Sequence, residues 1–229
     1  QIKKTQNLTE DLKDQVTSIL DLAKSKSGKM GLCCEKTNLE EIYQKAVTLG
    51  EGLQIQNNDS SFQHQIVDTG SPFICDQEKL LTLIRNLLGN AFKFKSLEKS
   101  NRIDFRMIRN EKTLKIEVSD TGLGIAKKNI DKIFSNFHQV NELSNSRIEG
   151  TGIGLALVKS IIEILGGKIE TASTLGVGTS ITLTIPEQVI TVIERKHESL
   201  IEAIDQPNME YNQSASCQDG IGAIEPASI

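Results

Sequence analysis

The 229-residue sequence predicts a two-layer α/β sandwich, in which helices cover one face of a sheet and a long amphipathic helix precedes the sandwich. Two patterns predict it. Several segments alternate apolar and polar residues with the period of a half-buried strand, and other segments carry apolar residues at helical spacing. With 38% hydrophobic residues, the chain can bury one main core and still carry additional segments.

Composition and charge exclude several classes of protein. The net charge is −4 and no basic face dominates, so we expect no nucleic-acid partner. There is no apolar run of membrane-spanning length and no signal peptide. The cysteines form no Cys-x-x-Cys pair, which predicts reduced thiols in the cytoplasm rather than disulfides or a zinc site; they are Cys33, Cys34, Cys75 and Cys217.

Residues 1–30 predict one amphipathic helix that ends near Ser27-Gly28. We expect the chain, which begins at Gln1, to be a fragment of a longer protein. The helix can lie on its own domain or form half of a dimerising hairpin or coiled coil. The spacing of its apolar residues is compatible with both arrangements. Its apolar residues are Leu8, Leu12, Val16, Ile19, Leu20 and Ala23.

The next segments predict the first elements of the sandwich. Residues 32–35 fit a short edge strand, and Thr37 or Asn38 fits the N-cap of a helix that carries Leu39, Ile42, Ala46, Val47 and Leu53. Short strands are predicted at 62–67 and 73–75, separated by a Gly- and Pro-containing turn at 68–72.

A helix predicted over 77–95 places Asn86, Asn90 and Lys93 on one face, at positions i, i+4 and i+7. An amide oxygen can ligate Mg²⁺ and an ammonium can neutralise phosphates, so this face is a candidate site for a metal-bound phosphate. A solvated polar face is the alternative. The buried stripe is predicted to contain Leu80, Ile84, Leu87, Ala91 and Phe94.

Strands predicted at 102–108 and 112–119 lead into Asp120-Thr121-Gly122-Leu123-Gly124-Ile125. This arrangement puts a carboxylate at a sheet edge, where it can accept from an exocyclic amine such as that of adenine. The glycines allow a sharp turn and the close approach of a flat ligand. The alternative interpretation is an ordinary Asp-x-Gly turn.

A short helix is predicted over 127–134, and residues 135–149 have the polar composition of a mobile lid. The lid ends at Gly150-Thr151-Gly152-Ile153-Gly154, directly before an amphipathic helix. Free N–H groups and the helix dipole favour phosphate there. No strand precedes this glycine run and no Gly-Lys-Ser/Thr follows it, which disfavours Rossmann and Walker sites. Strands predicted at 168–172 and 178–185 close the domain.

Together these motifs resemble the GHKL ATP-binding superfamily, whose fold is the Bergerat two-layer α/β sandwich. The segment around Asn90 resembles the N box, Asp120–Ile125 the first glycine box, residues 133–137 the F box, and Gly150–Leu155 and Gly176–Thr179 the second and third glycine boxes. The resemblance covers residues 31–186 and is closest to sensor histidine kinases. It implies that 1–30 is the second helix of a dimerisation and phosphoacceptor hairpin and that 187–229 is a C-terminal helix and linker or tail.

The resemblance implies a role for each matching residue. Asn90 would ligate Mg²⁺ and, with Lys93, serve catalysis at the phosphates, while Phe94 would contact the base and Asp120 would accept from the adenine amine. Gln139 would lie in the lid near the phosphates. The implied ATP contacts are Asn86, Asn90, Lys93, Phe94, Asp120, Gly122, Gly124, Ile125, Gln139, Gly150, Thr151, Gly152, Gly154, Leu155 and Thr179.

One position distinguishes kinases from hydrolases within the superfamily. Hydrolases of the gyrase and chaperone type carry a Glu four residues before the metal-binding Asn, as general base for water. Here that residue is Asn86, an amide that cannot take a proton. The sequence therefore favours phosphoryl transfer to a protein group over hydrolysis.

The phosphoacceptor motif of histidine kinases is missing from this sequence. His64 falls in a predicted strand, His138 in the lid, and His197 lacks the expected Thr-Pro. We therefore expect the acceptor His on an upstream helix, a homodimer formed through the first helix, and a response-regulator receiver domain as partner, with any membrane anchor upstream. The alternatives are a GHKL-type ATPase and a non-catalytic nucleotide-binding module.

Overall fold

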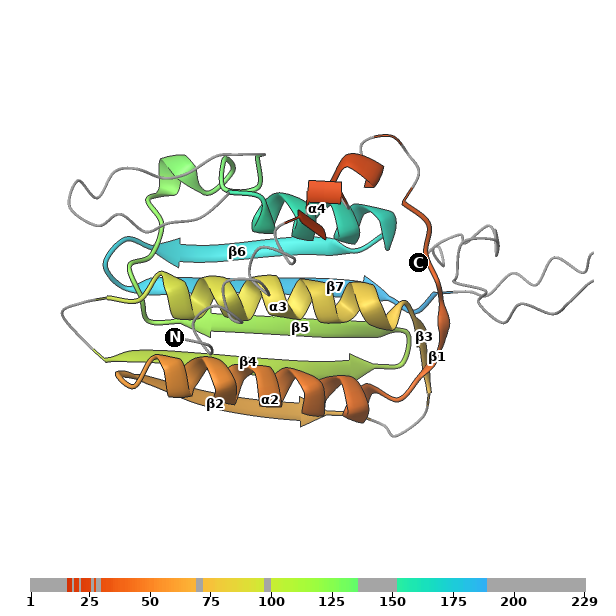
Figure 1. Ribbon diagram of the computed structural model, residues 1–229, viewed down its shortest axis with the longest axis horizontal. Coiled ribbons are helices and arrows are strands. Elements are labelled where there is room, and N and C mark those ends of the chain that lie inside the picture. The colour runs from red at the N-terminus through yellow and green to blue at the C-terminus, as the bar shows by residue number, and fades with distance from the viewer. Residues whose placement is uncertain are drawn as a thin grey trace, which may run out of the picture.

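The computed structural model describes residues 16–17, 19–20, 22–25, 27, 30–68, 72–96, 100–135 and 152–188, and the structural statements below refer to these residues. The described chain is a two-layer α/β sandwich, as the sequence predicts. Helices α2, α3 and α4 lie side by side over one face of a five-stranded sheet (Figure 1).

The sheet has the strand order β2-β4-β5-β7-β6. Strands β2 and β4 are parallel, and the other neighbours are antiparallel. A separate antiparallel pair joins β1 to β3. The strands are β1 (Glu35–Thr37), β2 (Ser60–Val67), β3 (Phe73–Cys75), β4 (Asn101–Asn110), β5 (Thr113–Asp120), β6 (Lys168–Thr174) and β7 (Gly178–Pro186).

Among helices α2, α3 and α4, the first two begin with short polar side chains. Asn38 accepts from the N–H of Glu40 at 3.0 Å and caps α2 (Leu39–Gln56). Asp76 accepts from the N–H of Lys79 at 2.9 Å and caps α3 (Gln77–Lys93). Helix α4 (Gly154–Ile164) has no side-chain cap.

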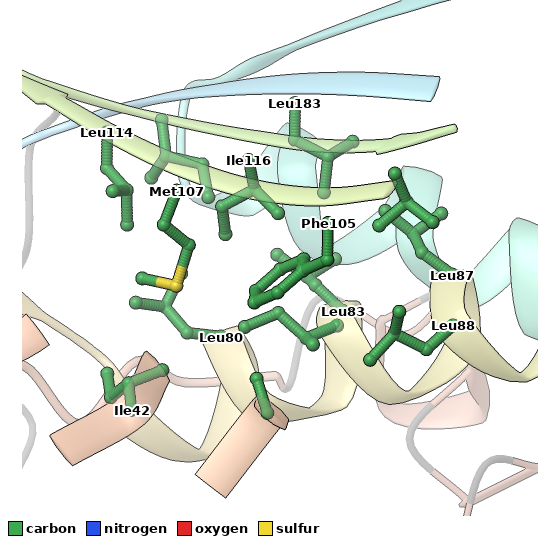
Figure 2. Close-up of a cluster of buried hydrophobic side chains, with 14 of the residues drawn as sticks. Ile42, Leu80, Leu83, Leu87, Leu88, Phe105, Met107, Leu114, Ile116 and Leu183 are labelled. Atoms are coloured by element: carbon green, nitrogen blue, oxygen red, sulfur yellow. The ribbon is translucent and has the colours of Figure 1, made fainter. Parts of the chain in front are cut away.

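Helix α3 is the central helix of the core. Its apolar stripe packs on the alternating apolar residues of β4, β5 and β7, and Figure 2 shows Leu83 facing Phe105 across this interface. Burial of each such side chain contributes about 1.5–3 kcal/mol. The fully buried residues of the interface include Leu80, Leu83, Leu88, Phe105, Met107, Ile116 and Leu183.

Several boundaries differ from the sequence prediction. Strand β1 begins at Glu35, the last residue of the strand predicted over 32–35, because the N–H of Cys33 donates to the capping carboxylate of Asp76 at 2.8 Å. The helix predicted over 127–134 is a single 3-10 turn, η1 (Lys127–Asn129), followed by irregular turns. Strand β6 extends two residues further, to Thr174, since pairing with β7 continues to Gly178.

Phe94 was wrongly assigned to the buried stripe of α3. It is the C-cap residue, with φ −92° and ψ 38°, and its side chain is 40% exposed. Because the helix ends at Lys93, Phe94 leaves the helical stripe, and Phe92 is buried instead.

The described residues between 16 and 25 are helical. Leu22 is buried in a small cluster with Ile153 and Ala156 at the start of α4, so this helix contacts its own domain. Leu22 lies outside the predicted apolar stripe, of which Val16, Ile19 and Leu20 are about half exposed. No helix in the described ranges is long and apolar enough to span a membrane.

The described fold continues to Gln188. Its N–H donates to the carbonyl of Ile74 at 2.9 Å, and its buried side-chain amide donates to the carbonyl of Leu165 at 3.0 Å. Gln188 thereby joins β3 to the end of α4, two residues beyond the boundary proposed from the sequence.

Candidate nucleotide-binding site

The end of α3 and the turn after β5 are joined directly. The N–H of Leu123 donates to the carbonyl oxygen of Phe94 at 2.9 Å. This bond places the first glycine box, Asp120 to Ile125, against the residues that end the N-box helix. The two motifs, predicted separately from the sequence, therefore form one site.

Gly122 orients the carboxylate of Asp120. The N–H of Gly122 donates to Oδ1 of Asp120 at 2.8 Å, in a short turn of the Asx type. A β-carbon on Gly122 would clash with the backbone carbonyl oxygen of Phe94. Glycine is therefore required for the turn to approach α3.

Asp120 belongs to a row of directly opposed residues across four strands. The register pairs Ile103 with Asp120, Asp120 with Thr179, and Thr179 with Ser173. Directly opposed residues project to the same face of a sheet, and Ile103 is fully buried beneath the helices. The row therefore forms the polar end of the helix-covered face.

The third glycine box is held against the first. The N–H of Gly176 donates to the carbonyl of Leu123 at 2.7 Å. Gly124 has a φ of 65°, and a β-carbon there would clash with the carbonyl oxygen of Thr174. A positive φ and this close contact both require glycine, so the two turns hold each other in place.

The start of α4 lies against the middle of α3. The amide nitrogen of Asn86 donates to the carbonyl of Thr82 at 2.8 Å, which turns its Oδ1 toward Gly154. A β-carbon on Gly154 would be 2.6 Å from that oxygen. Within the part of the chain that the structure describes, α4 has no side-chain cap, and the N–H groups of such a first turn can bind an anion near the Asn86 face of α3.

Asn90 and Lys93 lie on the last turns of α3. The side-chain amide of Asn90 makes no hydrogen bond to any other residue in the described ranges, although the residue is partly buried. Nζ of Lys93 lies 5.2 Å from the centre of the Phe94 ring. Lys93 is exposed as a residue, and partial desolvation of its ammonium by neighbouring groups lowers its pKa from the usual 10.5.

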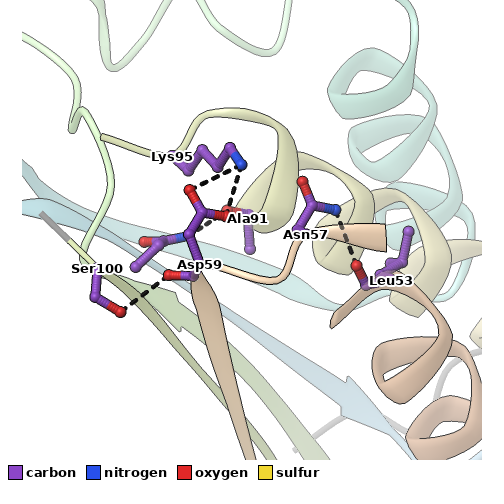
Figure 3. A network of polar contacts seen from close by, with 7 residues as sticks. Leu53, Asn57, Asp59, Ala91, Lys95 and Ser100 are labelled. Carbon is purple, nitrogen blue, oxygen red and sulfur yellow. Dashed lines mark hydrogen bonds and ion pairs between the residues drawn. The ribbon is translucent and has the colours of Figure 1, made fainter. Parts of the chain in front are cut away.

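A network of polar contacts surrounds the C-terminal end of α3, next to the site (Figure 3). Nζ of Lys95 contacts both carboxylate oxygens of Asp59, at 2.7 and 3.0 Å, and this contact lowers the pKa of Asp59. The amide of Asn101, at the start of β4, donates to the carbonyl of Ala91 at 3.1 Å. These bonds fix the position of the last turn of α3.

Three of the predicted site residues, Gln139, Gly150 and Thr151, lie outside the described residues, as do residues 136–149 of the lid predicted over 135–149 and the histidines His138 and His197. Gly152 is described and has a φ of 67°. Ile125 and Leu155 are half-buried beside the two glycine turns.

Two residues with a clear role in this geometry were missed from the sequence, Asn101 and Ser173. Oγ of Ser173 accepts from the N–H of Ile125 at 2.8 Å. Each residue has polar neighbours in the sequence, which was the only signal available. Their hydrogen-bond partners are distant in the sequence, so no local pattern identified the two residues. Ser173 and Ile125 also line a cavity of about 490 Å³ between β6 and residues 125–130.

A comparison with family models matches residues 75–189, just over half of the chain, to the histidine kinase-, DNA gyrase B- and HSP90-like ATPase family. The chain belongs to this family. The match includes the N-box helix and all three glycine boxes.

Several sensor histidine kinases are similar to this chain in sequence. The circadian input-output histidine kinase CikA of Synechocystis sp. is 34% identical over 179 residues, covering 77% of the chain and 24% of the relative. The sensor histidine kinase WalK of Bacillus subtilis is 30% identical over 182 residues, covering 80% of the chain and 30% of the relative. The chain thus spans less than a third of either protein.

Solved structures show the same fold. The histidine kinase AdeS of Acinetobacter baumannii matches with a TM-score of 0.63 and 21% identity, over 81% of the chain and 83% of that structure. Full-length ShkA in complex with AMPPNP matches with a TM-score of 0.66 and 19% identity, over 81% of the chain and 38% of that structure.

Proposed function

We propose that this chain is the ATP-binding catalytic part of a sensor histidine kinase, which transfers the γ-phosphoryl group of Mg-ATP to a His on an upstream helix. The carrying observation is the hydrogen bond between Leu123 and Phe94, which joins the candidate base-binding carboxylate to the candidate phosphate-binding face. Membership in the family and the named relatives support the same function.

The base end of the site is the Asp120 end. The N–H of Gly122 donates to the carboxylate of Asp120 and holds it at the end of the sheet. An ionised carboxylate in this position can accept hydrogen bonds from an exocyclic amine. The backbone of Phe94 contacts the same turn through the N–H of Leu123, and its exposed ring offers a surface to a flat base. Thr179 stands opposite Asp120 on the same face.

The phosphate end is the face of Asn90 and Lys93 together with the start of α4. The uncapped N–H groups of α4 and the ammonium of Lys93 both favour an anion. Mg²⁺ prefers oxygen ligands and keeps several waters, so the single amide oxygen of Asn90 fits as its protein ligand alongside the phosphates. When bound, Mg²⁺ would offset negative charge on those phosphates.

Phosphoryl transfer breaks the bond between the γ-phosphorus and the bridging oxygen of ADP and forms a bond to an imidazole nitrogen. Asn90, Lys93 and the N–H groups of α4 would hold the phosphates during this transfer. Asn86 cannot act as a general base for water, and its amide is already bonded to Thr82 and packed on Gly154. The kinase reaction is therefore favoured over ATP hydrolysis.

The test uses this chain and the longer protein with the residues that precede Gln1. The chain should bind ATP in a Mg²⁺-dependent way, and Asn90→Ala should remove that dependence. The longer protein should become labelled from γ-labelled ATP at a His, as an acid-labile and base-stable adduct. Steady release of inorganic phosphate without labelling would instead identify an ATPase. ATP binding without labelling and without phosphate release would identify a nucleotide-sensing module.

We also infer that the protein dimerises through its first helix and acts in the cytoplasm on a receiver domain of a response regulator. The exposed side chains of Val16, Ile19 and Leu20 support dimerisation, since a helix that faced only its own domain would not present three large apolar residues to water. Sedimentation of the chain should show a dimer that Ile19→Glu dissociates. A monomer at all concentrations would contradict this assembly.

A further inference from the structure

The hydroxyl of Ser173 on β6 makes three close polar contacts. It lies 2.8 Å from the backbone nitrogen of Ile125, 2.9 Å from the carbonyl oxygen of Gly178, and 2.9 Å from the hydroxyl oxygen of Thr179. These partners come from the first glycine box and from the last two residues of the third glycine box. Ser173 therefore connects the two turns that flank Asp120.

The hydrogen-bonding capacity of a hydroxyl determines which group donates in each contact. A serine hydroxyl has one proton and two lone pairs. A carbonyl can only accept, so the Ser173 proton points to Gly178, while the Ile125 N–H uses one lone pair. The second lone pair must then accept the proton of Thr179, because two oxygens 2.9 Å apart without a proton between them would repel.

The position of Thr179 makes this proton direction relevant to a ligand. Thr179 is directly opposed to Asp120 on one side and to Ser173 on the other, on the helix-covered face of the sheet. With its proton committed to Ser173, the hydroxyl of Thr179 can only accept from a third group. The carboxylate of Asp120 also only accepts when ionised.

We propose that Ser173 is a specificity-determining residue that makes the site select a 6-amino purine over a 6-oxo purine, by keeping the hydroxyl of Thr179 in an acceptor-only orientation. The inference rests on the proposed function, in which this end of the site binds the base of ATP. A 6-amino group brings two N–H donors to the Asp120 and Thr179 acceptors. A 6-oxo group brings an acceptor, which the same pair of oxygens repels.

Removal of the Ser173 hydroxyl frees the rotation of Thr179. In Ser173→Ala the Thr179 hydroxyl can donate as well as accept, so it can satisfy a 6-oxo group. We expect the ratio of affinities for ATP over ITP to fall by about tenfold, the equivalent of roughly one hydrogen bond. ITP is the suitable probe because it differs from ATP only at the 6-position and the linked N1 proton.

The experiment measures ATP and ITP binding to the 229-residue chain by calorimetry for the wild type, Ser173→Ala, Ser173→Thr and Ser180→Ala. Ser173→Thr keeps the hydroxyl and should restore the wild-type ratio. Ser180 is the matched control, since it is the next residue on β7, faces the other side of the sheet and bonds to Ser119 at 2.8 Å. Its replacement should leave the ratio unchanged.

Thermal unfolding of each variant is recorded first, and Ser173→Cys, which donates only weakly, replaces Ser173→Ala if that variant does not fold. Equal weakening of ATP and ITP, or no change in either, would show a purely structural role and overturn the inference. A wild type that binds no ATP would refute the proposed function itself, and this result is visible before any variant is compared.

Discussion

Gly122 lies against the carbonyl oxygen of Phe94 so closely that a β-carbon at position 122 would overlap it. The neighbouring N–H of Leu123 donates to the same oxygen. The C-terminus of α3 and the turn after β5 therefore meet through backbone atoms, which cannot move aside as a flexible side chain can.

Gly122→Ala should destabilise the fold by about 1–3 kcal/mol and weaken ATP binding, because the turn must move away from Phe94. Urea unfolding followed by circular dichroism measures the first effect, and calorimetry measures the second. Gly52→Ala in α2 is the matched control. No atom lies within 4 Å of its added β-carbon, so it should stabilise the protein by about 0.5–1 kcal/mol. Equal stability of the two variants would contradict the close contact at Gly122.

Asp120→Asn should weaken ATP binding by at least about tenfold while the fold remains intact. The Asn side chain keeps an oxygen that can accept from the N–H of Gly122, so the turn survives. It loses the negative charge, and one of its two acceptors becomes a donor that repels the adenine amine. Unchanged ATP affinity, with unfolding also unchanged, would remove Asp120 from the site.

Gly154→Ala should destabilise the protein by about 1 kcal/mol, and Asn86→Ala in the same chain should relieve that cost. The added β-carbon would stand 2.6 Å from Oδ1 of Asn86, whose amide is held by the carbonyl of Thr82. A double-mutant cycle on urea unfolding energies measures the coupling. Simple additivity of the two single changes would show that α3 and the start of α4 do not meet at these residues.

ATP affinity should fall as the pH rises from neutrality toward 10.5, the usual pKa of a lysine, because partial desolvation lowers the pKa of Lys93 below that value. Loss of the proton would remove the charge that Lys93 is proposed to present to the phosphates. Over the same interval the free energy of unfolding should increase, so the folded protein becomes more stable. The reason is that the unfolded chain retains this proton to higher pH than the folded chain does. Binding titrations and urea unfolding across this range measure the two opposite trends.

Lys93→Arg supplies the control for this pH dependence. Arginine stays charged throughout the interval, so the variant should keep its ATP affinity as the pH rises. If both proteins lose affinity in parallel, another group is responsible for the effect.

Much of the fold could be predicted from local patterns. The alternation of Leu114, Ile116 and Val118 identified β5, and the helical spacing of Leu80, Ile84 and Leu87 identified the buried face of α3. Errors occurred where a tertiary contact overrides the local signal. Strand β1 begins later than predicted because Asp76, far along the chain, takes the N–H of Cys33.

The site residues were proposed from their types and their order along the chain, since Asn, Asp and glycine runs carry chemistry that can be named without a structure. Ser173 and Asn101 were missed because their importance comes from partners in other elements. Each satisfies a backbone group more than nine residues away, and nothing in its own neighbourhood signals this.

The sequence by itself determined the two-layer fold class, the family resemblance and the absence of a general base at Asn86, because periodicity and residue chemistry are local properties. Only the tertiary structure decided that the end of α3 and the two glycine turns share one site, since that depends on backbone bonds from Leu123 to Phe94 and from Gly176 to Leu123. It also decided the direction of the Thr179 proton, because that proton depends on Ser173, which pairs with Thr179 only when β6 and β7 meet.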